Sequence, residues 1–344
     1  DILERAQIKL DNKLVAKEIF NKCVLVTGGA GSIGSEIVRQ AAGYKPQSII
    51  ILDQAETPLH SIHLEIKNKF PKLKYTAVIC DVRDIEKTRK IFREYKPNVV
   101  YHAAAYKHVP LMEKHPSEAI FANVLGTKNV ADLSQEFGVE KFVMVSTDKA
   151  VNPSNVMGAS KRIAEIYVQA LQENNNKNIK KSTSFVTTRF GNVLGSNGSV
   201  VPLFKKQIEN GGPVTITHPD IIRYFMTISE ACQLVLEAGA MGNGGEIFIF
   251  DMGKAVKIID LAKKIIRLAG YIPNQDMPIK IIGLRPGEKL YEELLNDKTT
   301  TLPTYNEKIM IAKVNSHNIT QLKSDILELI NLSKDNDKAS IVKK

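Results

Sequence analysis

The chain has 344 residues, of which 43% are hydrophobic and 24% are charged, a composition typical of a globular protein with one large domain or two unequal ones. No apolar run approaches the roughly 18 residues that a membrane-spanning helix requires, and residues 1–14 are too polar for a signal peptide. The formal net charge of +10 comes largely from scattered lysines without an arginine-rich run, which disfavours nucleic acid as a partner and is compatible with an anionic metabolite.

Cysteines and histidines give no sign of a disulfide framework or a metal site. Cys23, Cys80 and Cys232 lie far apart in apolar surroundings, which predicts buried free thiols. His60 and His63 could share a helix face, but no cysteine or carboxylate partner completes a ligand set around them. We therefore expect no metal.

Apolar, strand-like runs alternate with helix-like patterns through the first two-thirds of the chain. The predicted strands are Cys23–Thr27, Ser48–Asp53, Tyr75–Asp81, Val99–Ala103, Lys141–Ser146 and Ser184–Arg189. The predicted helices between them are Ser35–Ala42, Leu59–Lys69, Ile85–Tyr95, Pro116–Phe137 and Gly158–Gln172. This alternation predicts an α/β fold, a doubly wound parallel (Rossmann) sheet with helices on both faces, joined to a smaller mixed α/β region.

Changes in pattern suggest the domain boundaries. Residues 1–21 read as an amphipathic lead-in, and residues 22–191 as the dinucleotide-binding domain. Glycine-rich turns make the pattern irregular after that, so residues 192–313 are expected to be mainly a substrate-binding region, with room for one return to the sheet. Residues 314–344 read as a helix ending in a frayed, charged tail from Ser333.

A glycine-rich turn, Thr27–Gly34, follows the first strand and opens a helix. Gly28 permits a tight turn, Gly31 lets the backbone approach a pyrophosphate, and Gly34 allows close packing of helix and strand. Asp53 stands 19 residues after Gly34 at the end of the second strand, where a carboxylate binds the adenosine ribose. Together these features predict a dinucleotide site.

The ends of the next strands extend this site. Asp81 is placed to hydrogen-bond the adenine, and the small residues Ala103, Ala104 and Ala105 leave room for the dinucleotide. Asp53 would repel a 2′-phosphate, so NAD is favoured over NADP. The residues predicted to line the site are Gly28, Gly31, Ser32, Ile33, Gly34, Asp53, Asp81, Val82, Ala103, Ala104 and Ala105.

The stretch after the fifth strand carries groups suited to acid–base chemistry. Thr147, Asp148 and Lys149 stand at a strand end, where functional groups collect on an open α/β sheet. Asp148 and Lys149 offer a carboxyl and an amine side by side. Met157 and Lys161 lie four positions apart on one helix face, and a thioether cannot move a proton.

In these features the chain resembles the extended short-chain dehydrogenase/reductases, and within them the polysaccharide-biosynthesis branch, the UDP-N-acetylglucosamine 4,6-dehydratases. The matching stretches, spread from about Lys22 to Leu295, are Thr27–Glu36, Ala103–Glu113, Asn123–Gly126, Ser146–Lys161, Arg189–Gly198 and Leu284–Glu288.

Methionine at position 157 resembles the long, membrane-anchored members, which retain configuration at carbon 5, whereas short inverting members usually have tyrosine there. With a first residue other than methionine, this resemblance implies the cytoplasmic catalytic part of a longer protein anchored in the inner membrane. It also implies a homo-oligomer, a dimer or higher.

The resemblance implies NAD-dependent dehydration of UDP-N-acetylglucosamine to UDP-2-acetamido-2,6-dideoxy-4-keto-hexose, for bacterial surface polysaccharide. Asp148 would protonate the departing carbon-6 hydroxyl and Lys149 would take the carbon-5 proton, or the reverse; the ionic attraction between them opposes the pKa shifts that the first assignment needs. Thr147 would hydrogen-bond the carbon-4 hydroxyl. Lys161, with Asn123, belongs to the implied cofactor site and would hold the nicotinamide ribose.

The base for oxidation at carbon 4 stays open between a water, Asp148 and Lys161, with Met157 packing only. Lys107 is expected to reach substrate or cofactor phosphates. The further positions associated with nucleotide-sugar binding are Asn192, Arg223, Arg285 and Glu288, of which the two arginines suit a diphosphate and Glu288 suits the uridine ribose.

Two other functions compete with dehydration. A nucleotide-sugar 4-epimerase shares the fold and cofactor but normally uses the tyrosine and lacks an acid–base pair like Asp148 and Lys149. A non-catalytic NAD-binding sensor or scaffold is suggested only by Met157.

Overall fold

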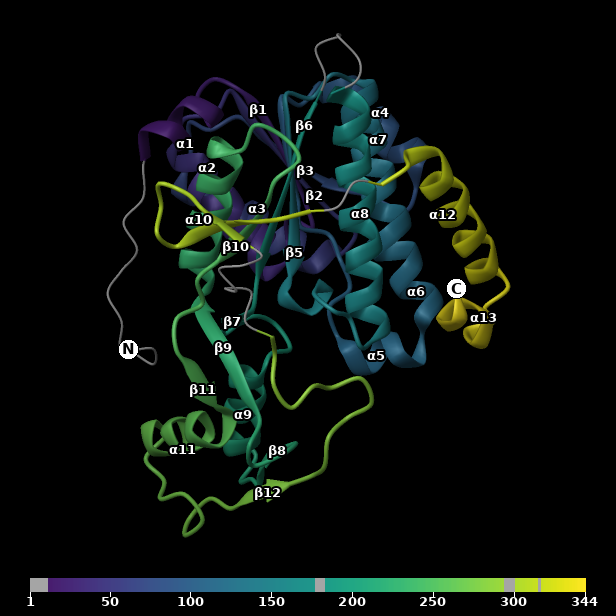
Figure 1. The fold of residues 1–344 in the computed structure, drawn as a ribbon. Helices are drawn as coiled ribbons and strands as arrows, with labels where there is room; N and C mark the ends of the chain where they lie inside the picture. The colour runs from purple at the N-terminus through teal and green to yellow at the C-terminus, as the bar shows by residue number, and fades with distance from the viewer. Residues whose placement is uncertain (1–11, 177–182, 294–300, 315–316) are drawn as a thin grey trace.

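The computed structural model describes residues 12–176, 183–293, 301–314 and 317–344, and its core is one large, mainly parallel sheet (Figure 1). The strand order is β13-β14-β10-β6-β5-β4-β1-β2-β3, with parallel pairing from β3 through β10 and antiparallel pairing of β14 and β13. These strands are β1 (Cys23–Thr27), β2 (Ser48–Asp53), β3 (Tyr75–Ile79), β4 (Val99–His102), β5 (Lys141–Thr147), β6 (Ser184–Phe190), β10 (Ile247–Phe250), β13 (Thr301–Pro303) and β14 (Ile309–Ala312).

Successive side chains of the central strands enter two separate apolar cores. Val24 and Val26 pack on one face of the sheet, whereas Leu25 packs on the other. The helices of the first face are α1 (Asn12–Ile19), α2 (Ser32–Gly43), α3 (Glu56–Lys69) and α10 (Ile228–Met241). Those of the second face are α4 (Ile85–Tyr95), α7 (Gly126–Glu136), α8 (Val156–Asn176) and α12 (Ile319–Lys334). The predicted doubly wound Rossmann sheet is confirmed.

One predicted helix contains an irregularity that matters for the site. The run predicted as a single helix over Pro116–Phe137 is α6 (Pro116–Ala119), a π-helical stretch η1 (Ile120–Leu125) and α7. A π-helical stretch inside a helix is rare and frequently lies at a functional site. Here it carries Asn123, whose side chain is fully buried.

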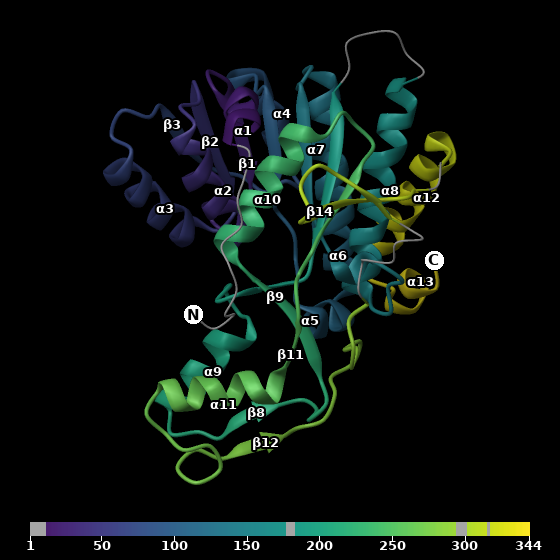
Figure 2. The same ribbon diagram turned by 60° about the vertical axis from the view of Figure 1, so that its left-hand side comes forward.

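A smaller lobe lies at the carboxyl ends of the parallel strands (Figures 1 and 2). It has its own apolar core, to which α9, α11, β8 and β9 contribute. Its elements are β7 (Asn192–Leu194), α9 (Val200–Glu209), β8 (Val214–Ile216), β9 (Ile222–Thr227), β11 (Ala255–Lys257), α11 (Ile258–Leu268) and β12 (Ile279–Ile281). The chain does return to the sheet, as the sequence allowed, but it does so twice and not once, first with β10 and then with β13 and β14.

The end of the chain is folded against the second face of the sheet. The prediction of a frayed tail was wrong: α13 (Lys338–Lys343) packs near α6 and α12, and Ile341 is buried. Asp337 caps this helix by accepting hydrogen bonds from the backbone N–H groups of Ala339 and Ser340. Among the described residues, no helix has the length and apolar character needed to cross a bilayer.

We expect α13 to contribute to stability through one side chain. Ile341→Ala should lower the free energy of unfolding by about 2 kcal/mol, because Ile341 is 5% exposed and its removal leaves a cavity. Val342→Ala is the matched control, since that neighbour is 58% exposed and should change stability by no more than about 0.5 kcal/mol. Urea unfolding measures both; equal effects would mean that α13 is not docked.

Candidate functional site

Two glycines allow the first strand's turn to approach its neighbours closely. Gly28 has a φ of +64°, and a Cβ there would lie 2.6 Å from the Ala104 backbone nitrogen. A Cβ on Gly34 would lie 2.0 Å from the Gly28 carbonyl oxygen. Gly31 is the N-cap of α2, so the helix N-terminus opens beside this turn. The backbone forms a cradle that any larger side chain would fill.

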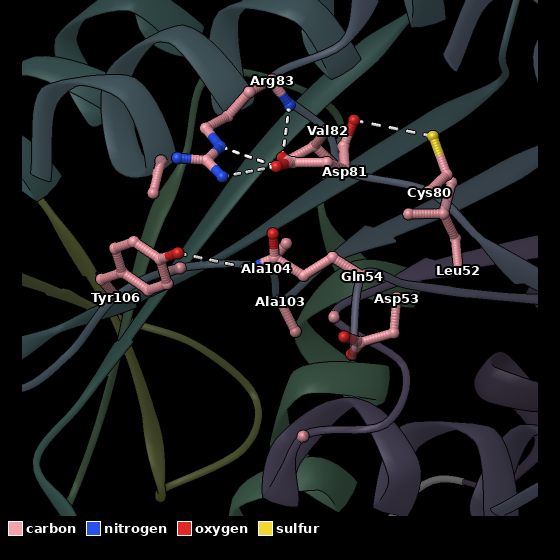
Figure 3. A pocket seen from close by; sticks show the side chains of 14 residues that line it. Leu52, Asp53, Gln54, Cys80, Asp81, Val82, Arg83, Ala103, Ala104 and Tyr106 are labelled. Atoms are coloured by element: carbon pink, nitrogen blue, oxygen red, sulfur yellow. Dashed lines mark hydrogen bonds and ion pairs between the residues drawn. The ribbon is translucent and has the colours of Figure 1, made fainter. Parts of the chain in front are cut away.

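A hollow of about 140 Å³ lies beside this cradle, at the ends of β1 to β4 (Figure 3). Its predicted walls are Gly28, Gly31, Asp53, Asp81, Val82, Ala103, Ala104 and Ala105. The walls that the sequence analysis missed are Leu52, Gln54, Cys80, Arg83, Tyr106 and Ala122. Glycine cradle, helix N-terminus and acidic strand end together fit a dinucleotide.

The two acidic residues of the hollow are in different situations. Asp53 accepts backbone N–H bonds from Ala30 and Ala55, both at 2.9 Å, which orient its carboxylate. The carboxylate of Asp81 is engaged by Arg83, whose Nε lies 2.7 Å from Oδ2 (Figure 3). Arg83 also pairs with Glu118 at 2.9 Å. The adenine contact predicted for Asp81 would therefore compete with Arg83, and the only early signal was an arginine two residues after an acidic strand end.

Asn123 holds the backbone of Tyr106, which lines the hollow. Its side chain accepts from the Tyr106 backbone nitrogen at 2.8 Å and donates to the Tyr106 carbonyl at 3.0 Å and to Ser160 Oγ at 2.9 Å. It thereby fastens the segment after β4 to α8.

Ser32, beside the glycine turn, accepts a hydrogen bond from the Asn197 backbone, while the Ile33 carbonyl accepts one from the Cys232 thiol.

Lys161 lies on α8 under the end of β5. Its ammonium donates to the Val145 carbonyl at 2.7 Å, and the residue is buried. Burial lowers the pKa of Lys161 to about 8, although Glu165 opposes the shift. The pKa of Lys161 therefore lies closer to neutrality than the ordinary value for a lysine.

Thr147, Asp148 and Lys149 form a connected group at the end of β5. Thr147 Oγ1 donates to Asp148 Oδ1 at 2.8 Å, and Lys149 Nζ lies 3.1 Å from the same oxygen. Glu292, which the sequence analysis did not single out, lies 3.2 Å from Lys149 Nζ. Burial alone would lower the pKa of Lys149, but the attraction of Asp148 and Glu292 outweighs it and the pKa is raised. A base role for Lys149 needs the opposite shift.

Met157 is a packing residue in this structure. It is 3% exposed and lies in an apolar cluster with Met112 and Ala119, against which Tyr106 also packs. Its backbone carbonyl accepts a hydrogen bond from Ser160. The side chain therefore joins α8 to the segments after β4, which is the role expected for it.

The predicted substrate residues gather around the start of the smaller lobe. Lys107 donates to Ser196 at 3.3 Å, and the buried side-chain nitrogen of Asn192 has no hydrogen-bond partner within the described residues. Glu288 accepts from Thr217 at 3.1 Å and from the Arg285 backbone nitrogen at 3.1 Å. Arg285 itself is exposed.

The guanidinium group of Arg223 is already engaged by other groups of the protein. It donates to the carbonyls of Ile222, Lys289 and Leu290 and lies 3.4 Å from Glu292. The diphosphate contact predicted for Arg223 would therefore require rearrangement of these bonds.

The sequence matches the family described as polysaccharide biosynthesis protein over residues 24–341. It is 54% identical over 332 residues to the capsular polysaccharide biosynthesis protein CapD of Staphylococcus aureus, covering 96% of this chain and 54% of that protein. It is 39% identical over 288 residues to an inverting UDP-N-acetylglucosamine 4,6-dehydratase of Campylobacter jejuni, covering 83% of this chain and 80% of that protein.

A UDP-glucose 4-epimerase of Rickettsia rickettsii is also similar, at 37% identity over 282 residues, covering 81% of this chain and 79% of that protein. The chain spans about half the length of the first curated relatives that it matches.

The cradle yields a prediction that separates two glycines of the same helix. Gly34→Ala should abolish retention of a bound dinucleotide and lower the melting temperature, because its Cβ would collide with the Gly28 carbonyl. Gly43→Ala meets no atom within 4 Å and should leave dinucleotide content unchanged while stabilising the protein by about 0.4–1 kcal/mol. Acid release of bound nucleotide and thermal unfolding measure both; unaltered binding in Gly34→Ala would contradict the assignment of the cradle.

Proposed function

The chain belongs to the polysaccharide biosynthesis protein family, and we propose that it is an NAD-dependent UDP-N-acetylglucosamine 4,6-dehydratase that retains configuration at carbon 5. The observation that carries this proposal is the hydrogen-bonded group at the end of β5, in which half-buried Thr147 and Lys149 flank the buried carboxylate of Asp148. Removal of water across carbons 5 and 6 needs an acid and a base at one sugar, and this group places both on adjacent residues.

The hollow supports NAD as the cofactor. Gly28, Gly31 and the N-terminus of α2 would hold the pyrophosphate, and Asp53, oriented by two backbone bonds, would hold the adenosine ribose. Arg83 is the arginine among the described walls, and its pairing with Asp81 and Glu118 leaves it poorly placed for a 2′-phosphate. When bound, NAD supplies a reversible hydride acceptor for a redox-neutral cycle at carbons 4 and 6.

The chain's own residues divide the remaining chemistry. Thr147 would orient the sugar by its hydroxyl, while Asp148 and Lys149 exchange protons with carbon 5 and the carbon-6 oxygen. For oxidation at carbon 4 there is no tyrosine, and Met157 is buried in an apolar cluster. Of the candidates, Lys161 has a pKa lowered to about 8 by burial, so it is favoured to take up the proton of the carbon-4 hydroxyl.

Substrate binding is proposed on the side of the smaller lobe. Asn192 offers a buried side-chain nitrogen that lacks a partner among the described residues, as expected of a donor kept for a ligand. Lys107 would reach a phosphate, as would the exposed side chain of Arg285, and Glu288, which accepts from the Arg285 backbone nitrogen, would meet the uridine ribose. These roles suit an anionic nucleotide sugar.

The 4-epimerase alternative accounts for less of the site. Epimerisation at carbon 4 needs oxidation, rotation and reduction, but no proton exchange at carbons 5 and 6. The costly burial of two carboxylates, Asp148 and Glu292, around half-buried Lys149 would then have no chemical purpose. We also propose that the activity is exerted by a homo-oligomer at the cytoplasmic face of the inner membrane, which light scattering and cell fractionation of the full-length protein would test.

Turnover of UDP-N-acetylglucosamine, followed by proton NMR, tests the function directly. We expect a carbon-6 methyl doublet to appear without net accumulation of NADH. Lys149→Met should retain bound dinucleotide and lose about 10²–10⁴ in rate, because it removes one positioned proton-transfer group. A galacto product would establish the epimerase instead, and full nucleotide occupancy without turnover would support a sensor.

The position of the missing tyrosine gives a separate prediction. Met157→Ala should reduce kcat by about tenfold or less, a loss of packing worth about 1.4 kcal/mol. Lys161→Ala should reduce it by about a hundredfold or more. Met157→Tyr should also reduce kcat, because the side chain is 3% exposed and a larger ring would crowd its cluster. A large rate gain in the tyrosine variant would show that oxidation is limited by the lack of a phenol.

A further inference from the structure

Glu292 belongs to the candidate site, although neither its position in the sequence nor a motif predicted this. Its side chain is 5% exposed and lies between two cations from separate parts of the fold. One carboxylate oxygen is 3.2 Å from Lys149 Nζ, and the same oxygen is 3.4 Å from Arg223 Nε. A carboxylate buried in this way must have partners, and these are the partners that the structure provides.

The segment that carries Glu292 is held firmly against the loop after β5. The Gly287 carbonyl accepts from Asn155 at 3.2 Å, and Lys289 donates to the Asn152 carbonyl at 3.0 Å. Arg223 is itself fixed, because its Nη2 donates a hydrogen bond to the Lys289 carbonyl at 2.7 Å. The carboxylate of Glu292 therefore has a defined position relative to Lys149.

Lys149 is surrounded by more negative than positive charge. Asp148 lies at 3.1 Å and Glu292 at 3.2 Å from its ammonium, and Arg223 is the cation that opposes them. Two carboxylates at such distances favour the ammonium form over the free amine, even where burial opposes it. The raised pKa of Lys149 agrees with this geometry.

We infer, on the basis of the proposed function, that Glu292 is a positioning residue that keeps Lys149 charged, so that Lys149 is the acid and Asp148 the base of water elimination. The carbon-5–hydrogen bond breaks and its proton passes to the Asp148 carboxylate. The carbon-6–oxygen bond breaks as Lys149 protonates that oxygen, water leaves, and a double bond forms between carbons 5 and 6.

The proton count closes over the cycle. When carbon 6 is reduced, Asp148 returns its proton to carbon 5. The proton released by the carbon-4 hydroxyl during oxidation restores the ammonium of Lys149. No proton is gained or lost beyond the water that leaves, and NAD, proposed above, is both the oxidant and the reductant.

The test compares two adjacent glutamates. Glu292→Gln keeps the size of the side chain and removes its charge. Glu293→Gln is the matched control, because Glu293 is 44% exposed in its side chain and pairs with Lys289 and Asn152 at the surface. Glu292→Asp is the second variant; its shorter side chain keeps the negative charge but holds it farther from Lys149. Melting temperatures verify that each variant is folded.

The first measurement does not depend on turnover. The pH dependence of acetylation of Lys149 by acetic anhydride, read by peptide mass spectrometry, gives the pKa of its amine. We expect Glu292→Gln to lower this pKa by about one unit or more, Glu292→Asp to lower it less, and Glu293→Gln to leave it unchanged. An unchanged pKa in Glu292→Gln overturns the inference whether or not the protein acts on UDP-N-acetylglucosamine.

The second measurement distinguishes acid from base. If Lys149 is the acid, the alkaline limb of the kcat profile moves to lower pH in Glu292→Gln by the same amount as the pKa measured by acetylation. At pH values on that limb, kcat then falls by up to about tenfold relative to Glu293→Gln, which stays within about twofold of wild type. A rise of kcat at neutral pH in Glu292→Gln would show that Lys149 acts as the base and would overturn the assignment. Loss of turnover in wild type would refute the proposed function alone, since the acetylation result stands by itself.

Discussion

Burial of charge at the carboxyl edge of the sheet is the constraint around which the site is arranged. Removing an ion from water costs several kcal/mol unless partners compensate it. Glu165 on α8 is fully buried and is bound by Arg189 of β6 at 2.8 Å and by Ser146 of β5 at 2.6 Å. These bonds fix α8 against the two central strands. The positions of Lys161 and Met157, about one and two turns earlier on the same helix, follow from that attachment.

The same constraint gives two lysines of one site opposite properties. Lys161 is buried against the Val145 carbonyl with one carboxylate near, so burial prevails and its pKa falls to about 8. Half-buried Lys149 lies between Asp148 and Glu292, so attraction prevails and its pKa rises. Neighbouring His102, enclosed by Thr27 and Thr127, is held neutral with a pKa lowered to about 3 by burial and by Lys161. Chemical identity alone does not assign a proton-transfer role here; the number of buried counter-charges does.

What could be predicted from the sequence follows from the range of each interaction. Strands can be predicted from local apolar runs, and the carboxyl ends of parallel strands meet at one edge of the sheet. The positions of Asp53 and Thr147 could therefore be predicted from the sequence. The pairing of Lys149 with Glu292 could not, because it depends on how the smaller lobe folds back onto the loop after β5. The burial of Ile341 could not be predicted for a related reason: a short segment with few large apolar residues looks like a tail unless its packing against α6 is known.

Replacing a phenol by a thioether changes which residues must carry protons. A tyrosine on α8 would serve oxidation at carbon 4 directly, whereas Met157 only fills space between Met112 and Ala119. The structure offers instead the amines of buried Lys161 and half-buried Lys149, whose pKa values are shifted in opposite directions. Lys161, near neutrality, is suited to accept the proton released at carbon 4, and Lys149, held charged, is suited to donate one at carbon 6. In the proposed dehydration, lysines tuned apart in this way would move a proton across the sugar without any phenol, because the free amine of Lys161 becomes accessible slightly above neutral pH while Lys149 stays charged.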